Sequence, residues 1–223
     1  GRIKPIESYA RNQLLRFYGK SSLKIDSKKS AIDWLEDVFS DAENSIKVPI
    51  FNIRNPEVAI SLGIEKKDNH KYSFIDIING LRENQNLLES LKSKTTDEQT
   101  LVEKQIIEVY QNVIFFDEIA HSMYCFLPII EIEDATLQDY MGLDKEKRVS
   151  YSFFMRNIKK FKVLLQNLLD TKEEDWNVSH MELSKIALQL QSLTQYHYSQ
   201  ALKIIPNFTA NDNEQWLSPW ELM

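Results

Sequence analysis

The feature that most constrains the fold is one unbroken series of apolar residues in the middle of the chain. Its members alternate spacings of four and three residues: Val102, Ile106, Val109, Val113, Phe116, Ala120, Met123 and Leu127. Such spacing places all of them on one face of an α-helix. Since Pro128 cannot continue a helix, the series predicts a helix over residues 102–127.

Two further series follow the same spacing. The first comprises Tyr151, Phe154, Ile158, Phe161, Leu165 and Leu168, and the second comprises Leu183, Ala187, Leu190, Thr194, His197, Ala201 and Ile204. Long helices with one apolar face bury it by packing against one another. The sequence therefore predicts an all-α fold: an antiparallel helical bundle of about five to seven helices with an extended N-terminal segment.

Composition agrees with one helical domain and excludes several classes of function. The 223 residues include 5 Gly and 6 Pro, too few for a turn-rich all-β fold. The formal net charge of −6 argues against nucleic-acid binding, which needs clustered Lys and Arg. Cys125 is the only cysteine, so the chain has no internal disulfide and no multi-cysteine metal site. The longest uncharged run, residues 186–202, is too polar to span a membrane.

Local signals mark where helices begin. Asn55 before Pro56 is an N-cap followed by proline at the first helical position, which predicts a short helix. Ser73 is expected to cap a helix over residues 74–91 that is interrupted at Gly80.

The tail of the chain carries another start signal. Ser218 and Pro219 form the opening of a helix, yet the sequence ends at Met223, so we expect the natural polypeptide to continue. The predicted single domain, 1–223, thus has three parts: the N-terminal motif and short helices (1–63), the long-helix bundle (73–206) and the tail (207–223).

Histidines on the predicted helices are the candidates for metal or haem binding. Glu118 and His121 stand at i and i+3, a unit that helical di-iron proteins use twice, and one copy is present here. Glu118 falls opposite the apolar series and His121 at its border, so a solvated helix face is the simpler interpretation. His197 falls on the apolar face of its helix, either as an axial haem ligand or as a hydrogen-bonded core histidine, the commoner case. No set of residues predicts a catalytic site.

The opening residues resemble a known motif. The segment Gly1-Arg2-Ile3-Lys4-Pro5-Ile6-Glu7-Ser8-Tyr9-Ala10-Arg11 resembles the start of a large extracytoplasmic region in Ccs-type (system II) cytochrome c biogenesis proteins. There the segment has the form G-R-x-K-P-hydrophobic-acid-hydroxyl-x-A-R, and Ser8 stands where Thr is expected. Trp34, the Pro49-Ile50-Phe51 turn, Asn55-Pro56, Tyr72-Ser73-Phe74 and the segment Trp216 to Trp220 follow at comparable places.

The resemblance implies an accessory domain on the periplasmic side of the bacterial inner membrane. The full-length protein would be an integral membrane protein that delivers haem and joins it to apocytochrome c, through membrane helices outside this chain. The domain itself would bind no cofactor and would not be catalytic alone. Arg2, Lys4 and Arg11 would contact a haem propionate or a partner, or else pair with nearby acids. The alternatives are a stand-alone helical protein–protein interaction domain and a helical-bundle metalloprotein that uses Glu118 and His121.

Overall fold

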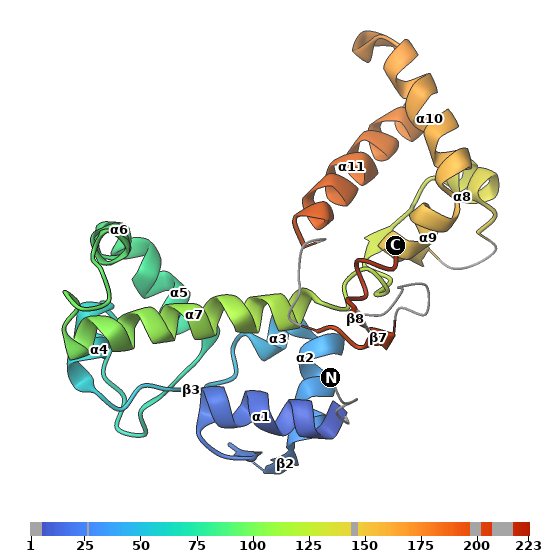
Figure 1. Ribbon diagram of the computed structural model, residues 1–223. Coiled ribbons are helices and arrows are strands. Elements are labelled where there is room, and N and C mark those ends of the chain that lie inside the picture. The colour runs from blue at the N-terminus through green and yellow to red at the C-terminus, as the bar shows by residue number, and fades with distance from the viewer. Residues whose placement is uncertain (1–5, 26, 144–146, 197–201, 207–215) are drawn as a thin grey trace, which may run out of the picture. The chain divides into compact units, whose positions relative to one another are not determined.

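The computed structural model describes residues 6–25, 27–143, 147–196, 202–206 and 216–223 (Figure 1). Contacts divide the chain into two compact units, Gly1–Ala120 (unit 1) and His121–Met223 (unit 2), a boundary that the sequence analysis did not place. The chain is 60% helical, with eleven α-helices in the described residues, so the prediction of a mainly helical fold is confirmed.

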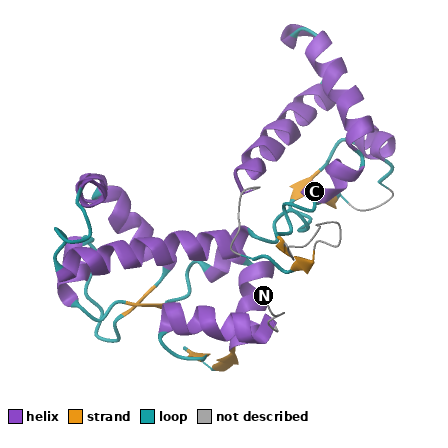
Figure 2. Ribbon diagram, in the orientation of Figure 1, coloured by secondary structure: helices purple, strands orange, loops and turns teal. Residues whose placement is uncertain are grey.

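The prediction of a purely α-helical bundle is wrong. Four antiparallel ladders of two short strands accompany the helices in the described residues (Figure 2). They pair β1 with β2, β3 with β4, β5 with β6 and β7 with β8. Each strand is only two or three residues long and lies outside the three apolar series or at their edges, so the helical periodicity carried no signal for them.

Unit 1 contains seven helices and four strands among its described residues. In chain order they are α1 (Ile6–Tyr18), β1 (Ser22–Lys24), β2 (Lys28–Ser30), α2 (Ala31–Ser40), α3 (Ala42–Ser45), β3 (Phe51–Asn52), α4 (Pro56–Ser61), β4 (Lys71–Tyr72), α5 (Phe74–Glu83), α6 (Gln85–Ser93) and α7 (Leu101–His121), whose last residue belongs to unit 2.

The core of unit 1 is an aromatic cluster built on α7. Phe116 is fully buried, and its ring centroid lies 5.9 Å from that of Phe17 on α1 and 5.6 Å from that of Phe51 on β3. Phe74 and Trp34 extend the cluster to α5 and α2. The apolar face of the long helix therefore packs against α1, β3 and α5, as its periodicity required, and α2 joins the cluster through Phe17.

Capping side chains fix the helix starts that the sequence predicted. The Ser73 hydroxyl accepts the backbone N–H of Asp76, and the Asp76 carboxylate accepts the N–H of Ser73, a reciprocal capping box. The Asn55 side chain accepts the N–H of Glu57 at the start of α4. Both predicted starts are confirmed.

The predicted interruption at Gly80 lies instead at Asn84, between α5 and α6. The Asn84 amide donates to the carbonyls of Leu62 and Gly80, so the side chain competes with the helix for backbone partners. Gly80 has a different role, since a Cβ built there would lie 2.3 Å from the Leu62 carbonyl oxygen and 2.6 Å from Ile64 Cγ2. The glycine permits close packing of α5 on residues 62–64.

Replacement of Gly80 by Ala is expected to lower the free energy of unfolding by about 1–3 kcal/mol, because backbone must move to admit the methyl group. The gain in helix propensity, about 1 kcal/mol, opposes this loss but does not cancel it. Urea denaturation of the variant measures the change. Asn79→Ala, at the exposed neighbouring position, is the control and should leave stability unchanged or slightly higher. A stability of the Gly80 variant equal to that of the control would contradict the packing argument.

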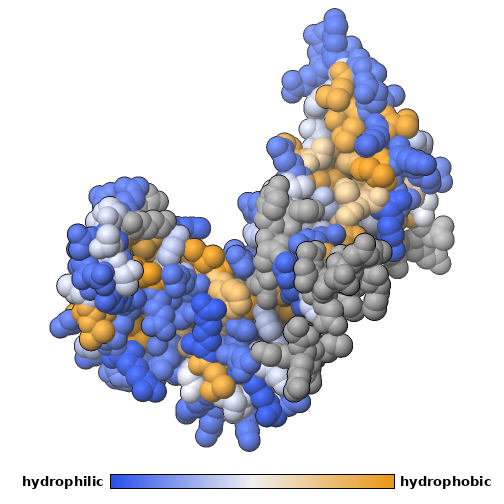
Figure 3. Space-filling view, in the orientation of Figure 1, coloured by the Kyte–Doolittle hydropathy of each residue, from blue (hydrophilic) through white to orange (hydrophobic). Residues whose placement is uncertain are grey.

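Unit 2 is built around two long helices and shorter elements. In chain order they are β5 (Ile130–Glu131), α8 (Ala135–Met141), β6 (Arg148–Val149), α9 (Tyr151–Arg156), α10 (Ile158–Asp170), the 3-10 turn η1 (Glu173–Asp175), α11 (Val178–Leu193), the 3-10 turn η2 (Thr194–Tyr196), β7 (Ile205–Pro206) and β8 (Trp216–Leu217). Hydrophobic side chains from these elements form one core, and others remain at the surface of α10 and α11 (Figure 3).

Two predicted long helices are shorter than expected. The helix expected over 102–127 ends at His121, and turns follow it. The series from Tyr151 to Leu168 is split at Asn157, whose side-chain amide donates to the Phe153 carbonyl. The apolar faces still enter the core on both sides of this break, because Phe154 and Phe161 are both buried.

The start signal at Ser218 forms a turn. The Ser218 N–H donates to the Glu221 carboxylate at 2.7 Å, and the Ser218 hydroxyl accepts the Glu221 N–H. This reciprocal pair brings the indole of Trp220 into the core of unit 2. Among the described helices, none combines the length and the apolar character needed to cross a membrane.

Candidate functional site

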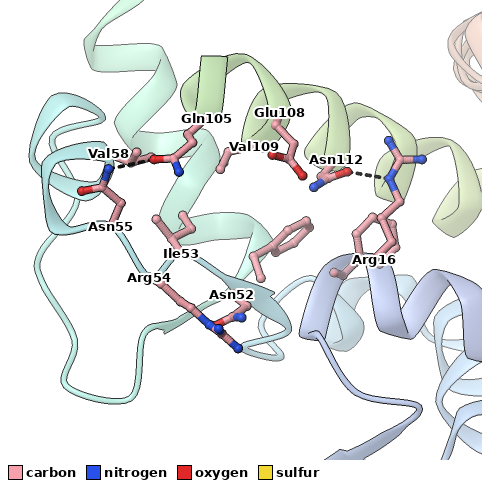
Figure 4. Close-up of a pocket in the computed structure, with 12 residues that line it drawn as sticks. Arg16, Asn52, Ile53, Arg54, Asn55, Val58, Gln105, Glu108, Val109 and Asn112 are labelled. Carbon is pink, nitrogen blue, oxygen red and sulfur yellow. Dashed lines mark hydrogen bonds between the residues drawn. The ribbon is translucent and has the colours of Figure 1, made fainter. Parts of the chain in front are cut away.

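A pocket of unit 1 lies between α1, residues 51–58 and α7, and has a volume of about 230 Å³ (Figure 4). Its polar lining consists of Arg16, Asn52, Arg54, Asn55, Gln105, Glu108 and Asn112. Its apolar lining consists of Phe17, Phe51, Ile53, Val58 and Val109. The apolar lining residues belong to the core of the unit, and two of them, Phe17 and Phe51, are members of the aromatic cluster. The pocket is therefore a polar hollow that borders this cluster.

Helix periodicity explains the α7 wall of the pocket. Gln105, Glu108 and Asn112 stand at i, i+3 and i+7, so they lie on one face of the helix. Val109, a member of the apolar series, lies beside them and also lines the pocket. The long helix thus turns one stripe into the aromatic core and a neighbouring polar stripe towards the pocket.

Strand alternation and a helix cap explain the opposite wall. Phe51 and Ile53 are buried, whereas Asn52 is half-buried and Arg54 is exposed, which is the alternation of an extended chain. Asn55 follows as the N-cap of α4. The requirement for a cap therefore places a third polar side chain at the end of this extended segment.

Two side-chain hydrogen bonds tie the walls together (Figure 4). The Arg16 Nε donates to Asn112 Oδ1 at 2.6 Å, and the Asn55 amide donates to Gln105 Oε1 at 2.7 Å. The guanidinium of Arg16 also lies 4.4 Å from the ring centroid of Phe115, a cation–π distance. Residues from α1, the 54–58 segment and α7 are thus held in fixed relative positions before any ligand binds.

The lining carries groups that can bind polar ligands. Amide side chains both donate and accept hydrogen bonds, and guanidinium groups bind carboxylates and phosphates. The pocket can recognise a small ligand or a peptide that carries amide and carboxylate groups.

Further cations lie beside Arg54. The Lys71 ammonium donates to the Tyr18 carbonyl at 2.6 Å and lies 3.9 Å from the centroid of the Tyr18 ring, so it caps the last turn of α1. Burial, together with the positive charges of Lys20 and Arg54, lowers the pKa of Lys71 to about 8. The surface around Lys71, Lys20 and Arg54 is therefore locally positive, although the whole chain has a formal net charge of −6.

The lowered pKa of Lys71 predicts a pH dependence of stability. The folded protein releases this proton near pH 8, whereas an unfolded lysine holds it to about pH 10.5. The unfolded state binds more protons between these values, so the free energy of unfolding rises with pH across that window. Lys71→Met removes this contribution while leaving every other titrating group in place. The stability of the wild-type protein relative to this variant should therefore increase from about pH 8 to pH 10 in urea denaturation; parallel curves would contradict the assignment.

The structure gives Arg11 a local partner. Its guanidinium donates to the Glu7 carboxylate at 2.6 Å, one turn earlier in α1, and both side chains are more than half exposed. Such an exposed pair contributes little to stability. Arg2, Lys4 and His197, the other predicted binding residues, lie outside the described residues, as does the predicted extended N-terminal segment.

Glu118 and His121 lie on the last turns of α7. Burial raises the pKa of the Glu118 carboxyl, and the charge of Asp117 raises it further. Glu118 in turn raises the pKa of the Tyr9 hydroxyl, which burial raises most. In unit 2 the His121 ring stacks on Tyr196, with centroids 4.0 Å apart. No group of three or more His, Cys, Asp or Glu side chains that could hold a metal ion occurs among the described residues.

Sequence reasoning missed the pocket because it followed apolar residues alone. The spacing of Gln105, Glu108 and Asn112 was visible in the sequence, and so was the run Asn52 to Asn55. Nothing local indicated that these two polar stretches face each other. No family model, no curated protein and no solved structure matches the chain.

Proposed function

We propose that this chain is an extracytoplasmic accessory domain of a cytochrome c biogenesis protein. In this role it supports the delivery of haem and its covalent attachment to apocytochrome c by the full-length protein. The domain works as a scaffold on the periplasmic side of the membrane. Haem and the reacting groups belong to other parts of that protein.

The observation that carries the proposal is the opening segment, Gly1 to Arg11, with its resemblance to Ccs-type biogenesis proteins. Its described part forms the first two turns of α1, where Ala10 is fully buried in unit 1 and the Arg11–Glu7 pair faces solvent. The segment therefore contributes to the folding of the domain. This is expected of a scaffold domain in which the motif marks the start of the domain.

The polar pocket adds support of a second kind. Its amides can pair with peptide groups, and Arg16 and Arg54 can pair with carboxylates. A segment of apocytochrome or a propionate-bearing ligand offers those groups. Neither requires a catalytic residue in this domain.

Disruption of the gene in its own cells tests the proposed function. Covalently bound haem is measured by haem staining of c-type cytochromes after gel electrophoresis. We expect holocytochrome c to fall to a small fraction of the wild-type level, and reintroduction of the intact gene to restore it. Unchanged holocytochrome c in the disrupted strain would reject the proposal.

Titration of the purified chain tests whether the domain itself contacts the reactants. Haem is followed by its Soret band, and a reduced Cys-x-x-Cys-His peptide by fluorescence anisotropy. If the pocket recognises the peptide, Arg54→Ala should weaken binding about tenfold, as expected for the loss of a charge-assisted hydrogen bond. Arg82→Ala, on the exposed side of α5, is the control and should bind as the wild type does.

The second candidate is a stand-alone helical protein–protein interaction domain. The exposed apolar residues of α11 favour it, because apolar residues that gather in one exposed patch mark an interaction site. In this case gene disruption would leave cytochrome c maturation unchanged.

A further inference from the structure

Helix α11 has two apolar faces, of which one is buried. The buried face consists of Leu183, Ile186, Leu190 and Leu193 and belongs to the core of unit 2. The second face consists of Val178, Met181, Lys185 and Leu188, which repeat the same spacing of three and four residues and are all exposed. The exposed fractions are 72% for Val178, 54% for Met181 and 63% for Leu188.

A groove of about 440 Å³ lies beside this face. One wall is α11, including Val178, Met181 and Lys185, and the other is the segment from Ile129 to Glu133, which contains β5. Ile129 is itself an exposed apolar residue on that second wall. The groove and the exposed face of α11 therefore form one continuous surface with apolar side chains along it.

The walls of the groove are held together at two places. The Glu182 carboxylate accepts the backbone N–H groups of Glu133 and Asp134, the latter at 2.7 Å. Further along α11, the Gln189 amide donates to the Ile129 carbonyl at 3.3 Å. A groove whose walls are fixed in advance loses less conformational entropy when a partner enters it.

The charge around the groove is negative. Glu131, Glu133 and Glu182 line it together with one cation, Lys185, and Glu131 also pairs with Arg148 on β6 at 3.3 Å, so the acids still outnumber the cations. The exposed acids of η1, residues 173–175, precede the Val178 end of the helix. Complementary charge selects partners and speeds their association, so the surface favours a basic partner.

The same charge argues against two other occupants. A second copy of this chain, with a formal net charge of −6, would place the same acids against each other. A membrane surface with anionic lipids would meet the same repulsion.

We propose that this groove and the exposed face of α11 bind a basic amphipathic helix of a partner protein. From Val178 to Leu188 the face extends about 15 Å, or three helical turns, since each residue adds about 1.5 Å. A partner helix of that length would carry apolar residues at i, i+3 or i+4, and i+7 to meet Val178, Met181 and Leu188, with Lys or Arg beside them. The inference is independent of the proposed function, because it rests on unit 2 alone.

Fluorescence anisotropy of the full chain with a labelled synthetic peptide tests the proposal. The peptide is an amphipathic sequence of Leu and Lys, about 14 residues long, whose leucines follow helical spacing. We expect saturable binding that weakens as salt is added. Leu188→Gln and Met181→Gln should each weaken it about tenfold or more, because each removes an apolar side chain that the peptide would bury.

Leu101→Gln at the start of α7 is the matched control, since it makes the same change at a leucine that is 72% exposed in unit 1. The double change Glu131→Gln and Glu133→Gln should weaken binding and reduce its salt dependence. Glu182 is left unchanged because its carboxylate holds the opposite wall. Circular dichroism and melting temperature verify that every variant folds like the wild type.

Three results would overturn the proposal. The first is equal binding by the Leu188→Gln and Leu101→Gln variants. The second is equal binding of a peptide in which Glu replaces every Lys. The third is sedimentation showing a dimer of the wild-type chain that Leu188→Gln dissociates, which would assign the face to a second copy.

Discussion

Replacement of Phe116 by Ala should lower the free energy of unfolding of unit 1 by about 3–5 kcal/mol, the usual loss for a buried aromatic side chain. Phe116 has no exposed surface, and its ring lies edge-on to those of Phe17 and Phe51. Loss of the ring leaves a cavity where α1, β3 and α7 meet. Such a change is a large fraction of the stability of most domains, so the variant should unfold at much lower urea concentration.

Ile114→Ala on the same helix is the control for Phe116→Ala. Ile114 is 41% exposed, so its truncation removes little buried surface and should cost less than about 1 kcal/mol. Circular dichroism in urea measures both variants. Equal stability of the two would show that the aromatic cluster is not the centre of unit 1.

Trp220→Ala should destabilise unit 2 by a similar amount, about 3–5 kcal/mol, although residue 220 is close to the end of the sequence. The indole is fully buried, its centroid lies 5.3 Å from that of Tyr151, and its Nε1 donates to the His121 carbonyl at 3.0 Å. The turn made by Ser218 and Glu221 positions it. Removal of the ring therefore empties a core position and takes away one of the two donors to the His121 carbonyl, which also accepts the Tyr124 N–H.

Two further variants separate packing from hydrogen bonding at this position. Trp220→Phe keeps most of the ring and loses one hydrogen bond, so it should cost about 0.5–1.5 kcal/mol, the usual net contribution of a hydrogen bond. Leu222→Ala, at a residue that is 52% exposed, should cost almost nothing. Hydrogen exchange measures the effect locally, with faster exchange expected in α9 of the Trp220→Ala variant. Exchange rates equal to those of Leu222→Ala would contradict the assignment of Trp220 to the core.

Much of the local structure was determined by the sequence itself. The caps at Asn55 and Ser73 act within three residues of themselves, so their helix starts could be predicted without knowledge of the fold. The apolar series of α7 likewise predicted a helix and the face that it buries, because periodicity is a property of the helix alone. These signals also predicted the mainly helical character of the chain.

The tertiary structure decided where the long helices end and which residues meet. Asn84 and Asn157 interrupt helices through hydrogen bonds to carbonyls, and the bond from Asn84 to Leu62 joins residues 22 positions apart in the sequence. The polar pocket depends on contacts between Arg16 and Asn112 and between Asn55 and Gln105, which are 96 and 50 positions apart. Periodicity assigns a residue to a face of its own helix and carries no information on what that face meets. The pocket and the groove beside α11 therefore became visible only when chain packing brought distant segments together.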